Sequence, residues 1–404
     1  MKISFYALGC RANQADNRKI QQELAKIGWQ VVCFSEPADF CVVNICAVTS
    51  GAEQRSRQML RAAKTNNAHV IASGCFIEKI PEIDLYFKSP KQTLNYLKKI
   101  HTSTPKPIPR TRTRSFIRIQ DGCNFDCAYC LIKKIRGRSR SIPPHEIIRQ
   151  INQEIALGRK EITLTGINIM QYAHPGFNLV KLLEKILDKT DIPRIRLGSV
   201  DPRLVTDNFI NLFKNPRLRP DCGRDSDGQA RLLPHIHLSL QSGSDRILRL
   251  MNRGHTTKQY LKIIEQARDL NPLFSFTTDV ITGFPGETAA DHEKTLGIIK
   301  KAQFTKVHIF PYSDRPGTAS EKLGHKIPQK IKKQRLREIE QIAQAAKKNW
   351  LKNYQGKTLD VLFEQKTDRA WQGYTPYYFK VNQEDRNDLT NKIIQVKIGQ
   401  KNFI

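Results

Sequence analysis

The chain lacks any long hydrophobic run. It has 404 residues, of which 39% are hydrophobic. No stretch approaches the roughly 18 consecutive apolar residues that a membrane-spanning helix needs. Residues 1–10 also lack a small-residue cleavage site, so we expect them to form a strand and not a signal peptide. We therefore expect no association with a membrane.

Acidic residues are scarce relative to basic ones, and the chain has no even set of cysteines to pair. There are nine cysteines, an odd number with no secretion signal, which fits a reducing compartment and predicts a cytoplasmic protein. Only 38 Asp and Glu oppose 67 Lys and Arg, which leaves a formal net charge of +29. That excess is larger than solubility requires, and it indicates a polyanionic partner, with nucleic acid as the best candidate.

Three of the cysteines stand close together at the spacing C-x3-C-x2-C, as Cys123, Cys127 and Cys130. Thiolates at short spacing hold iron–sulfur clusters or zinc. A structural zinc site needs four ligands, and no fourth Cys or His lies near this loop. Three ligands on a four-iron cube would leave one iron open to a substrate. The spacing therefore favours a cluster, while a zinc knuckle or three unrelated buried cysteines remain the alternatives.

The first hundred residues alternate strand-like and helical patterns, which predicts a parallel, doubly wound α/β sheet. The expected strands are 3–8, 30–34, 40–45 and 69–73, and the expected helices are 15–27 and 49–64. Cys10, Cys46 and Cys75 each follow a strand directly, at the edge where such sheets bind ligands. They suggest a second cluster, although buried thiols would explain the same pattern. Cys33 and Cys41 lie inside or at the start of strands, and we expect both in the core.

Beyond a proline-rich, basic stretch at 101–113 with the composition of a linker, the alternation resumes. Six strand–helix units predict a partial barrel of parallel strands, whose carboxyl-end face carries the chemistry in barrel enzymes. The expected strands are 115–120, 161–165, 194–200, 235–241, 274–282 and 306–310. A long basic helix is expected at 329–349. Strand-like runs at 359–364, 374–381 and 393–398 then predict a small β-barrel that can stack bases and hold phosphates.

A series of short motifs runs through the whole chain. They are Gly9-Cys10-Arg11-Ala12-Asn13-Gln14, Val43-Asn44-Ile45-Cys46, Ser73-Gly74-Cys75, Gln120-Asp121-Gly122-Cys123, Arg136-Gly137-Arg138-Ser139-Arg140-Ser141, Leu238-Ser239-Leu240-Gln241-Ser242-Gly243, Asp279-Val280-Ile281-Thr282-Gly283-Phe284-Pro285-Gly286-Glu287, His308-Ile309-Phe310-Pro311-Tyr312-Ser313 and Gly373-Tyr374-Thr375. In this order they resemble the radical S-adenosylmethionine (SAM) methylthiotransferase family. The resemblance implies a methylthiotransferase N-terminal domain at 1–108, a radical SAM core at 109–343 and an RNA-binding TRAM domain at 344–404.

The same resemblance implies two 4Fe–4S clusters. One, on Cys123, Cys127 and Cys130, would bind SAM and generate the radical that removes a hydrogen from C2 of an adenine. The other, on Cys10, Cys46 and Cys75, would supply the sulfur. The residues expected to contact SAM are Tyr129, Thr165, Gly166, Asn168, Ser199, Asp201, Gln241, Asp279 and Gly283. The expected partners are the anticodon stem-loop of tRNA and an electron donor such as flavodoxin or ferredoxin, and the sulfur source stays unknown.

Within the family, Gly9-Cys10-Arg11 and the turn from Thr165 to Asn168 resemble the subgroup that acts on N6-threonylcarbamoyladenosine at tRNA position 37. The alternatives are the isopentenyladenosine subgroup and the one that modifies a ribosomal protein. A base ending in a carboxylate needs cationic donors, and the segment Arg136-Gly137-Arg138-Ser139-Arg140 is expected to supply them, with phosphate contact as its other possible role. The chain departs from the family in an insertion at 215–233, which contains Cys222, and in Lys133-Lys134.

Two classes of protein compete with this interpretation. One is an iron–sulfur electron carrier that binds RNA, and the other is an RNA-binding scaffold with a catalytically dead barrel. A carrier would not need six strand–helix units, and a dead scaffold would have lost some of the six cysteines of the two triads. All six are present.

Overall fold

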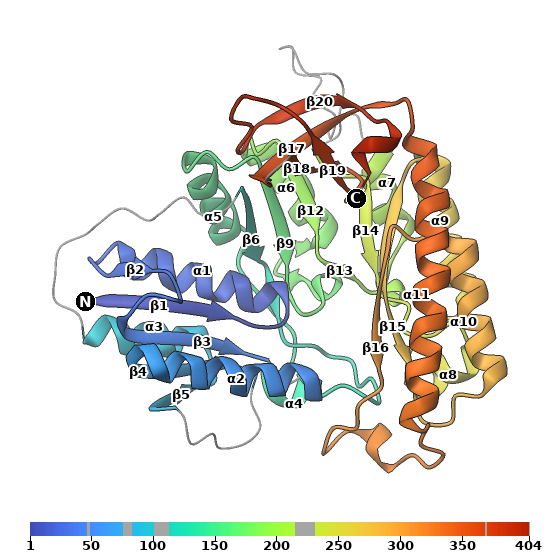
Figure 1. Cartoon of the computed structure of the whole chain (residues 1–404), viewed down its shortest axis with the longest axis horizontal. Coiled ribbons are helices and arrows are strands. Elements are labelled where there is room, and N and C mark those ends of the chain that lie inside the picture. The colour runs from blue at the N-terminus through green and yellow to red at the C-terminus, as the bar shows by residue number, and fades with distance from the viewer. Residues whose placement is uncertain (47–48, 76–82, 101–112, 215–230, 368–369, 404) are drawn as a thin grey trace.

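The computed structural model describes residues 1–46, 49–75, 83–100, 113–214, 231–367 and 370–403. All of the expected linker except Thr113, most of the insertion and Cys222 lie outside these ranges. The described chain forms an N-terminal α/β layer, a larger α/β barrel and a C-terminal antiparallel sheet (Figure 1). Among the described residues, no helix combines the length and apolar character needed to cross a membrane.

The N-terminal part is a five-stranded parallel sheet with the strand order β2-β1-β3-β4-β5. Its strands are β1 (Lys2–Ala7), β2 (Gln30–Val32), β3 (Ala38–Ile45), β4 (Asn67–Gly74) and β5 (Leu85–Phe87), and its helices are α1 (Arg11–Ala25), α2 (Ser50–Asn66) and α3 (Pro90–Lys99). Alternate side chains of β3 pack against opposite layers: Cys41 and Val43 meet Leu60 of α2, whereas Val42 meets Leu24 of α1. Helices on both faces confirm the doubly wound sheet.

One expectation for this sheet is wrong. Cys33 follows β2, which is an edge strand that ends at Val32, and the residue is exposed. Cys41, in the middle of β3, is fully buried as expected. The difference arises because the short edge strand has no neighbour on one side, so the residue after it is not covered.

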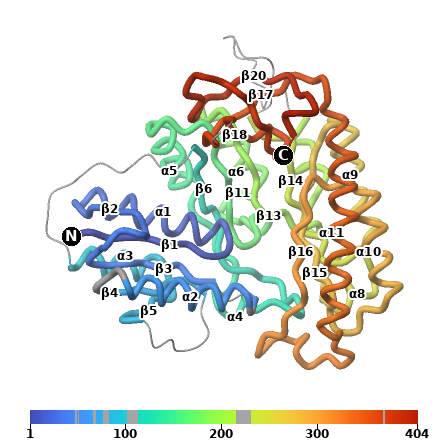
Figure 2. The backbone as a smooth tube through the Cα atoms, viewed as in Figure 1, coloured from blue at the N-terminus to red at the C-terminus, as the bar shows by residue number. Residues whose placement is uncertain are grey.

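The barrel consists of two parallel sheets, with the strand orders β12-β9-β6 and β13-β14-β15-β16. Its strands are β6 (Arg114–Arg118), β9 (Glu161–Thr165), β12 (Arg194–Leu197), β13 (Ser199–Val200), β14 (His235–Leu238), β15 (Ser275–Thr282) and β16 (Lys306–Pro311). The outer helices are α5 (Pro144–Ala156), α6 (Leu179–Lys189), α7 (Asp207–Asn211), α8 (Asp245–Leu250), α9 (Thr257–Leu270), α10 (Ala289–Ala302) and α11 (Gln329–Leu351). The tube view in Figure 2 shows the strands side by side with α9, α10 and α11 outside them. This arrangement confirms the predicted partial barrel.

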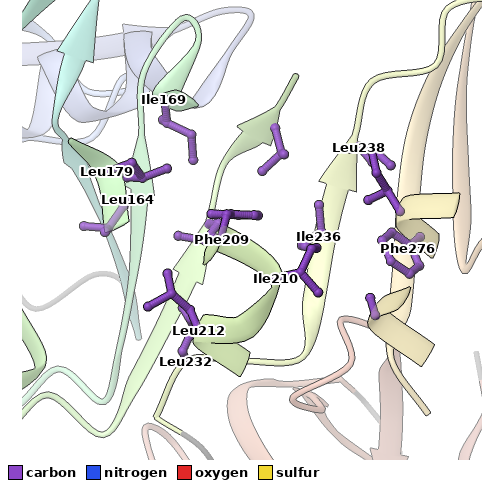
Figure 3. Packing of buried hydrophobic residues seen from close by; sticks show 14 of the residues in the cluster. Leu164, Ile169, Leu179, Phe209, Ile210, Leu212, Leu232, Ile236, Leu238 and Phe276 are labelled. Atoms are coloured by element: carbon purple, nitrogen blue, oxygen red, sulfur yellow. The ribbon is translucent and has the colours of Figure 1, made fainter. Parts of the chain in front are cut away.

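One continuous hydrophobic core lies between these strands and helices. Figure 3 shows Leu164 of β9, Phe209 of α7 and Ile236 of β14 as part of that cluster. All three side chains are fully buried. Burying an apolar side chain of this size stabilises a fold by about 1.5–3 kcal/mol, so this packing holds the barrel strands in place.

The C-terminal part is an antiparallel sheet with the order β19-β18-β17-β20. Its strands are β17 (Thr358–Lys366), β18 (Trp371–Tyr374), β19 (Lys380–Gln383) and β20 (Ile393–Lys397). The expectation of one strand over 374–381 is wrong, because a tight turn separates β18 from β19. The amide of Tyr378 donates to the carbonyl of Thr375 at 3.1 Å, and Tyr378 adopts a positive φ of 65°. The turn projects Tyr378 toward the barrel, where it stacks on His235.

Helix α1 connects the N-terminal layer to the barrel (Figure 1). Arg18 pairs with Glu154 of α5 at 2.6 Å, and Asp16 pairs with Arg118 of β6 at 2.9 Å. Glu154 and Asp16 are both nearly fully buried. The residue after Cys10 is the first of this helix, so the contacts also fix the position of that cysteine relative to the barrel.

Candidate active site

The cysteine loop at 123–130 lies between β7 (Gln120–Asp121) and α4 (Ile132–Arg136). The amide of Cys123 donates to the carbonyl of Gly137 at 3.1 Å, and that of Cys130 donates to the carbonyl of Cys127 at 3.0 Å. Gly122, with a φ of +73°, makes the tight approach possible, since a Cβ there would lie 2.2 Å from the carbonyl oxygen of Arg138. These turns bring the three thiols close enough for Cys123 and Cys127 to act electrostatically on Cys130.

Several donors surround these thiols. The side-chain amide of Gln171 lies 3.5 Å from the Sγ of Cys123, and the backbone amide of Ile132 lies 3.5 Å from the Sγ of Cys130. The guanidinium groups of Arg203 and Arg253 reach the Sγ of Cys127 at 3.8 and 3.6 Å. Donors and positive charge favour the thiolate form, which is the form that binds iron.

The surroundings of the loop also change the pKa of two of its neighbouring groups, Cys130 and Asp201. Loss of solvent, followed by the nearby charges of Cys127 and Cys123, raises the pKa of Cys130 to about 11, against a lowering by the Ile132 amide. Burial acts to raise the pKa of Asp201, but its bond to Arg203 and the charge of Arg253 outweigh burial and lower that pKa. Asp201 therefore stays ionised beside the loop.

The second triad gathers at the carboxyl edge of the N-terminal sheet. Cys46 and Cys75 are buried and Cys10 is exposed. Gly9, with a φ of +84°, lies so close to Cys46 that a Cβ on it would be 2.7 Å from the Cys46 Sγ. The side-chain amide of Asn13 donates to the carbonyls of Leu8 at 2.8 Å and of Ile45 at 3.1 Å, so it ties together the ends of β1 and β3. Cys10 and Cys46 follow those strand ends.

Arg136 lies between the two triads. Its Nε is 3.2 Å from the Sγ of Cys75, and one Nη is 2.8 Å from the Oδ1 of Asn13. The other Nη is 3.0 Å from the Oδ1 of Asp121, next to the first cysteine loop. Burial acts to lower the pKa of Arg136, but the charges of Cys75, Asp121 and Asp16 outweigh burial and raise it. Arg136 is thus a permanently charged contact between the N-terminal layer and the barrel.

The residues expected to contact SAM fall into three places. Near the cysteine loop, Thr165 ends β9, a Cβ on Gly166 would lie 2.8 Å from the carbonyl oxygen of Gln120, and the amide of Asn168 donates to Gln120 Oε1 at 2.9 Å. Asn168 Nδ2 lies 3.4 Å from Asp201, which pairs with Arg203 at 2.6 Å. Tyr129 is part of the loop itself. Asn168 is thus connected to Cys127 through Asp201 and Arg203, and Thr165 and Gly166 lie beside Gln120, three residues before Cys123.

The other expected contacts lie farther along the barrel. Ser199 is in β13. The backbone N–H of Gln241 donates a hydrogen bond to the carbonyl oxygen of Asp279 in β15 at 2.9 Å. The amide of Gly283 donates to Glu287 at 2.6 Å. The Oδ2 of Asp279 lies at hydrogen-bond distance, 3.1 Å, from the Nε2 of His237. The structure therefore connects Asp279 to a histidine and not directly to the cysteine loop.

Sequence reasoning missed Gln120, Gln171, Arg203 and Arg253. Arg203 stacks its guanidinium 3.4 Å from the centroid of the Phe125 ring, besides its contacts with Cys127 and Asp201. Arg253 pairs with Asp201 at 3.4 Å. Arg203 follows the Asp201-Pro202 turn, so its place at a strand end was a usable signal. Nothing in the local sequence around Arg253 points to the cysteine loop.

Polar side chains also line the barrel interior, and we call Arg11, His235, His237, Asp279, His308 and Tyr378 the interior cluster. Thr277 Oγ1 contacts His235 Nε2 at 3.1 Å and His237 Nδ1 at 3.0 Å. His235 is fully buried and its ring stacks on Tyr378 with centroids 4.5 Å apart. Burial, and then the charges of Arg196 and Arg11, holds the pKa of His235 well below its usual value. The cluster joins the N-terminal helix α1, the barrel and the C-terminal sheet.

Within the described residues, no three His, Cys, Asp or Glu side chains form a group able to hold a single metal ion. A four-iron cluster differs, because each thiolate binds a different iron and the sulfurs stay farther apart. The thiol triads with their surrounding donors fit such a cluster.

Two family models match this chain, and each covers one of the two thiol triads. The sequence model of the Radical SAM superfamily matches residues 117–299, which span the Cys123 loop and most of the barrel. The model described as uncharacterized protein family UPF0004 matches residues 2–93, which include Cys10, Cys46 and Cys75.

Several curated proteins are similar along nearly the whole chain. The threonylcarbamoyladenosine tRNA methylthiotransferase MtaB of Chlamydia pneumoniae is 35% identical over 390 residues, covering 93% of this chain and 90% of that protein. The protein with the same name from Aquifex aeolicus is 34% identical over 392 residues, covering 90% and 92%. A tRNA-2-methylthio-N(6)-dimethylallyladenosine synthase of Chloroflexus aurantiacus is 31% identical over 428 residues, covering 97% and 88%.

A solved structure supports the fold. The radical S-adenosylmethionine methyltransferase TsrM from Kitasatospora setae, with cobalamin and a 4Fe-4S cluster bound, superposes with a TM-score of 0.54 at 11% identity. The match covers 79% of this chain and 77% of that one.

Proposed function

Because the chain belongs to the radical SAM methylthiotransferase family, we propose that it adds a methylthio group to C2 of N6-threonylcarbamoyladenosine at position 37 of tRNA. The observation that carries this proposal is the pair of thiol triads on either side of Arg136. One triad belongs to the barrel and the other to the N-terminal sheet, and Arg136 contacts residues of both. A substrate bound between the two triads would be next to both the proposed radical-generating cluster and the proposed sulfur-supplying cluster.

The barrel triad of Cys123, Cys127 and Cys130 is proposed to hold a 4Fe–4S cluster with one iron open to SAM. When bound, that cluster supplies the electron that cleaves SAM to a carbon radical, and a second 4Fe–4S cluster on Cys10, Cys46 and Cys75 supplies the sulfur. Arg203 and Arg253 donate toward Cys127, and Gln171 donates toward Cys123. Asp201 keeps the two arginines in position through ion pairs at 2.6 and 3.4 Å.

The other proposed SAM contacts act by position. Asn168, tied to Gln120 and Asp201, borders the loop and can donate to a bound carboxylate or ribose. Thr165 ends β9, Gly166 follows it and lets Gln120 pack closely against the backbone, and Ser199 begins β13. Tyr129, Gln241, Asp279 and Gly283 are proposed contacts on the remaining sides of the site.

The net charge of +29 and the names of the relatives support tRNA as the substrate. We propose that the chain has three domains: a methylthiotransferase domain at 1–108, a radical SAM core at 109–343 and a TRAM domain at 344–404 that binds RNA. An electron donor of the flavodoxin or ferredoxin type would reduce the barrel cluster. The target base lies in a single-stranded loop, so the enzyme does not have to break a base pair to reach it.

Relatives with both substrate names occur, so the choice of substrate needs a direct test. The reconstituted enzyme would be given anticodon stem-loops that are identical except for the modification at position 37. Faster methylthiolation of the threonylcarbamoyl loop than of the isopentenyl loop is expected. A preference for the isopentenyl loop would overturn the substrate assignment and leave methylthio transfer intact.

A further inference from the structure

Four arginines approach Tyr374 and Tyr378 at the junction of the barrel and the C-terminal sheet, and three of them have a carboxylate partner. Arg114 pairs with Glu364 at 2.5 Å, and Arg194 and Arg196 pair with Glu161 at 3.9 and 2.9 Å. Arg11 differs. Within the described part of the chain, it has no carboxylate within ion-pair distance.

Arg11 is held in place all the same. One Nη lies 2.5 Å from the hydroxyl oxygen of Tyr378, across 367 residues of sequence, and the guanidinium carbon lies 5.4 Å from the Tyr378 ring centroid. The side chain is half-buried. A half-buried guanidinium with no carboxylate at ion-pair distance can still accept an anionic ligand, which would add the charge-assisted hydrogen bonds that such a pair makes.

The tyrosine that holds Arg11 also borders a cavity. Tyr378 and Tyr374 line this cavity of about 500 Å³ together with Lys306 of β16, Lys347 of α11 and the acid Glu340, and Arg11 stands next to it through its contact with Tyr378. Ligand pockets of about 300–1,000 Å³ are typical for small organic groups. The one acid of the interior cluster, Asp279, already pairs with His237 at 3.1 Å. Burial acts to raise the pKa of Asp279, but the charges of His237, His308 and Arg11 outweigh burial and lower it. Asp279 thus acts on Arg11 at longer range, and within the described residues the two form no ion pair.

The segment expected from sequence to supply the cation is less suitable. The guanidinium of Arg136 is fully engaged with Cys75, Asn13 and Asp121. Arg138 and Arg140 are exposed, and Arg140 donates to the Arg136 carbonyl at 3.3 Å. Neither exposed residue loses water or is fixed in one geometry, so neither discriminates strongly between ligands.

We propose that Arg11 binds the carboxylate of the threonylcarbamoyl group and so selects this base over one with an uncharged side group. The proposal rests on the proposed function, and it adds the residue that reads the substrate. Tyr378 accepts from Arg11 and orients it, which makes Tyr378 a positioning residue. Arg11 directly follows Cys10, so the selected group would lie next to the thiol triad proposed to deliver sulfur.

An anion at Arg11 could instead be a phosphate of the tRNA backbone. The two sources give different patterns, because every loop carries phosphates and only the threonylcarbamoyl loop carries the carboxylate. Three fluorescent anticodon stem-loops, with adenosine, isopentenyladenosine or threonylcarbamoyladenosine at position 37, would be titrated by anisotropy. The reconstituted enzyme would be used without reductant, so binding is measured with no turnover.

The parent enzyme is expected to bind the threonylcarbamoyl loop best. Arg11→Gln should weaken that binding at least about tenfold, which corresponds to about 1.4 kcal/mol. Its binding of the other two loops should stay within about twofold. Tyr378→Phe, which keeps Arg11 and leaves the residue next to Cys10 untouched, should give a smaller loss on the same loop alone. The matched control is Arg138→Gln, which should change none of the preferences.

Each other outcome has a distinct meaning. Equal weakening of all three loops by Arg11→Gln would assign a phosphate to Arg11 and overturn the proposal. Unchanged discrimination in Arg11→Gln, or its loss in Arg138→Gln, would do the same. If the parent enzyme itself prefers the isopentenyl loop, the proposed function fails, and that result is separate from the behaviour of Arg11. Iron content is measured for every variant, and Tyr378→Phe decides the matter if Arg11→Gln loses iron.

Discussion

The Nε of Arg136 lies 3.2 Å from the Sγ of Cys75, so a residue that follows the barrel cysteine loop touches a cysteine of the N-terminal sheet. The same guanidinium contacts Asp121 at 3.0 Å. One buried cation thus links the two thiol triads, which are 48 residues or more apart in the sequence, Cys75 to Cys123 being the shortest interval. This link between the triads predicts effects on stability, and the triads themselves predict iron content and activity.

Replacing Arg136 by Met should destabilise the fold strongly. The change leaves the buried carboxylate of Asp16 with one cation fewer and Asp121 without its closest partner. Removing one member of a buried ion pair costs about 3–5 kcal/mol in the free energy of unfolding, measured here by urea denaturation. Arg140→Met is the matched control, since Arg140 is 72% exposed at 3.9 Å from Asp121, and it should change stability by less than about 0.5 kcal/mol. Equal effects of both variants would contradict the role of Arg136.

Iron content tests the assignment of two clusters. Anaerobically reconstituted protein is expected to bind about eight irons per chain, four on each triad, by the ligand requirement of 4Fe–4S clusters. Replacing Cys123, Cys127 and Cys130 together by Ala should halve that number. Cys33→Ala is a control, because Cys33 is exposed and outside both triads. A parent value near four irons would show the N-terminal triad to be empty.

The two triads should also separate by activity. Cys46 is buried, its amide donates to Ser56 at 3.1 Å, and it belongs to the sheet and not to the barrel. Cys46→Ala should therefore keep reductive cleavage of SAM and stop methylthio transfer. The two products, 5′-deoxyadenosine and the modified nucleoside, would be quantified in the same reaction. Parallel loss of both activities in a folded variant would count against this division.

Acid should weaken the fold through His255. Burial, and then the charge of Arg253, lowers the pKa of this side chain from 6.5 to about 4. The unfolded chain then binds a proton that the folded chain does not, so the free energy of unfolding falls as pH falls from about 6.5 to about 4. For His255 the loss between pH 7 and pH 5 should be about 1–2 kcal/mol. His255→Asn should show a smaller difference between urea unfolding at the two pH values, and an unchanged difference would refute the argument.

Binding of tRNA should depend steeply on salt. Lys306, Lys347 and Lys380 line the 500 Å³ cavity beside the C-terminal sheet, and phosphate contacts release counterions. Affinity should fall about tenfold or more between 50 and 200 mM salt, and replacing Lys347 and Lys380 by Gln should flatten the slope. Point variants are preferable to truncation, because buried Arg196 donates to the carbonyls of Thr375 and Pro376 in the C-terminal sheet. An unchanged slope would exclude this surface.

The sequence predicted the elements of this fold better than their contacts. Strand β9 has the expected bounds, Glu161–Thr165, because its run of apolar and β-branched residues is buried on both faces. The turn between β18 and β19 was missed, since aromatic residues from Tyr374 to Phe379 have strong strand propensity and only the positive φ of Tyr378 breaks the strand.

Contacts within the site were predictable only where neighbours in sequence made them. The spacing of Cys123, Cys127 and Cys130 indicated three thiols on one loop, and their role as cluster ligands stays a prediction. Arg203 and Arg253 reach Cys127 from 76 and 126 residues away, so their role depends on how the barrel closes. The same holds for Arg11 and Tyr378, whose contact joins the two ends of the chain.

The most direct test of the central claim is mass spectrometry of tRNA nucleosides from cells with and without this protein. The account predicts that 2-methylthio-N6-threonylcarbamoyladenosine disappears without the protein, that N6-threonylcarbamoyladenosine accumulates in its place, and that 2-methylthio-N6-isopentenyladenosine stays unchanged. Complementation with the Cys46→Ala variant should not restore the product. Loss of the isopentenyl product, with the threonylcarbamoyl product intact, would contradict the account.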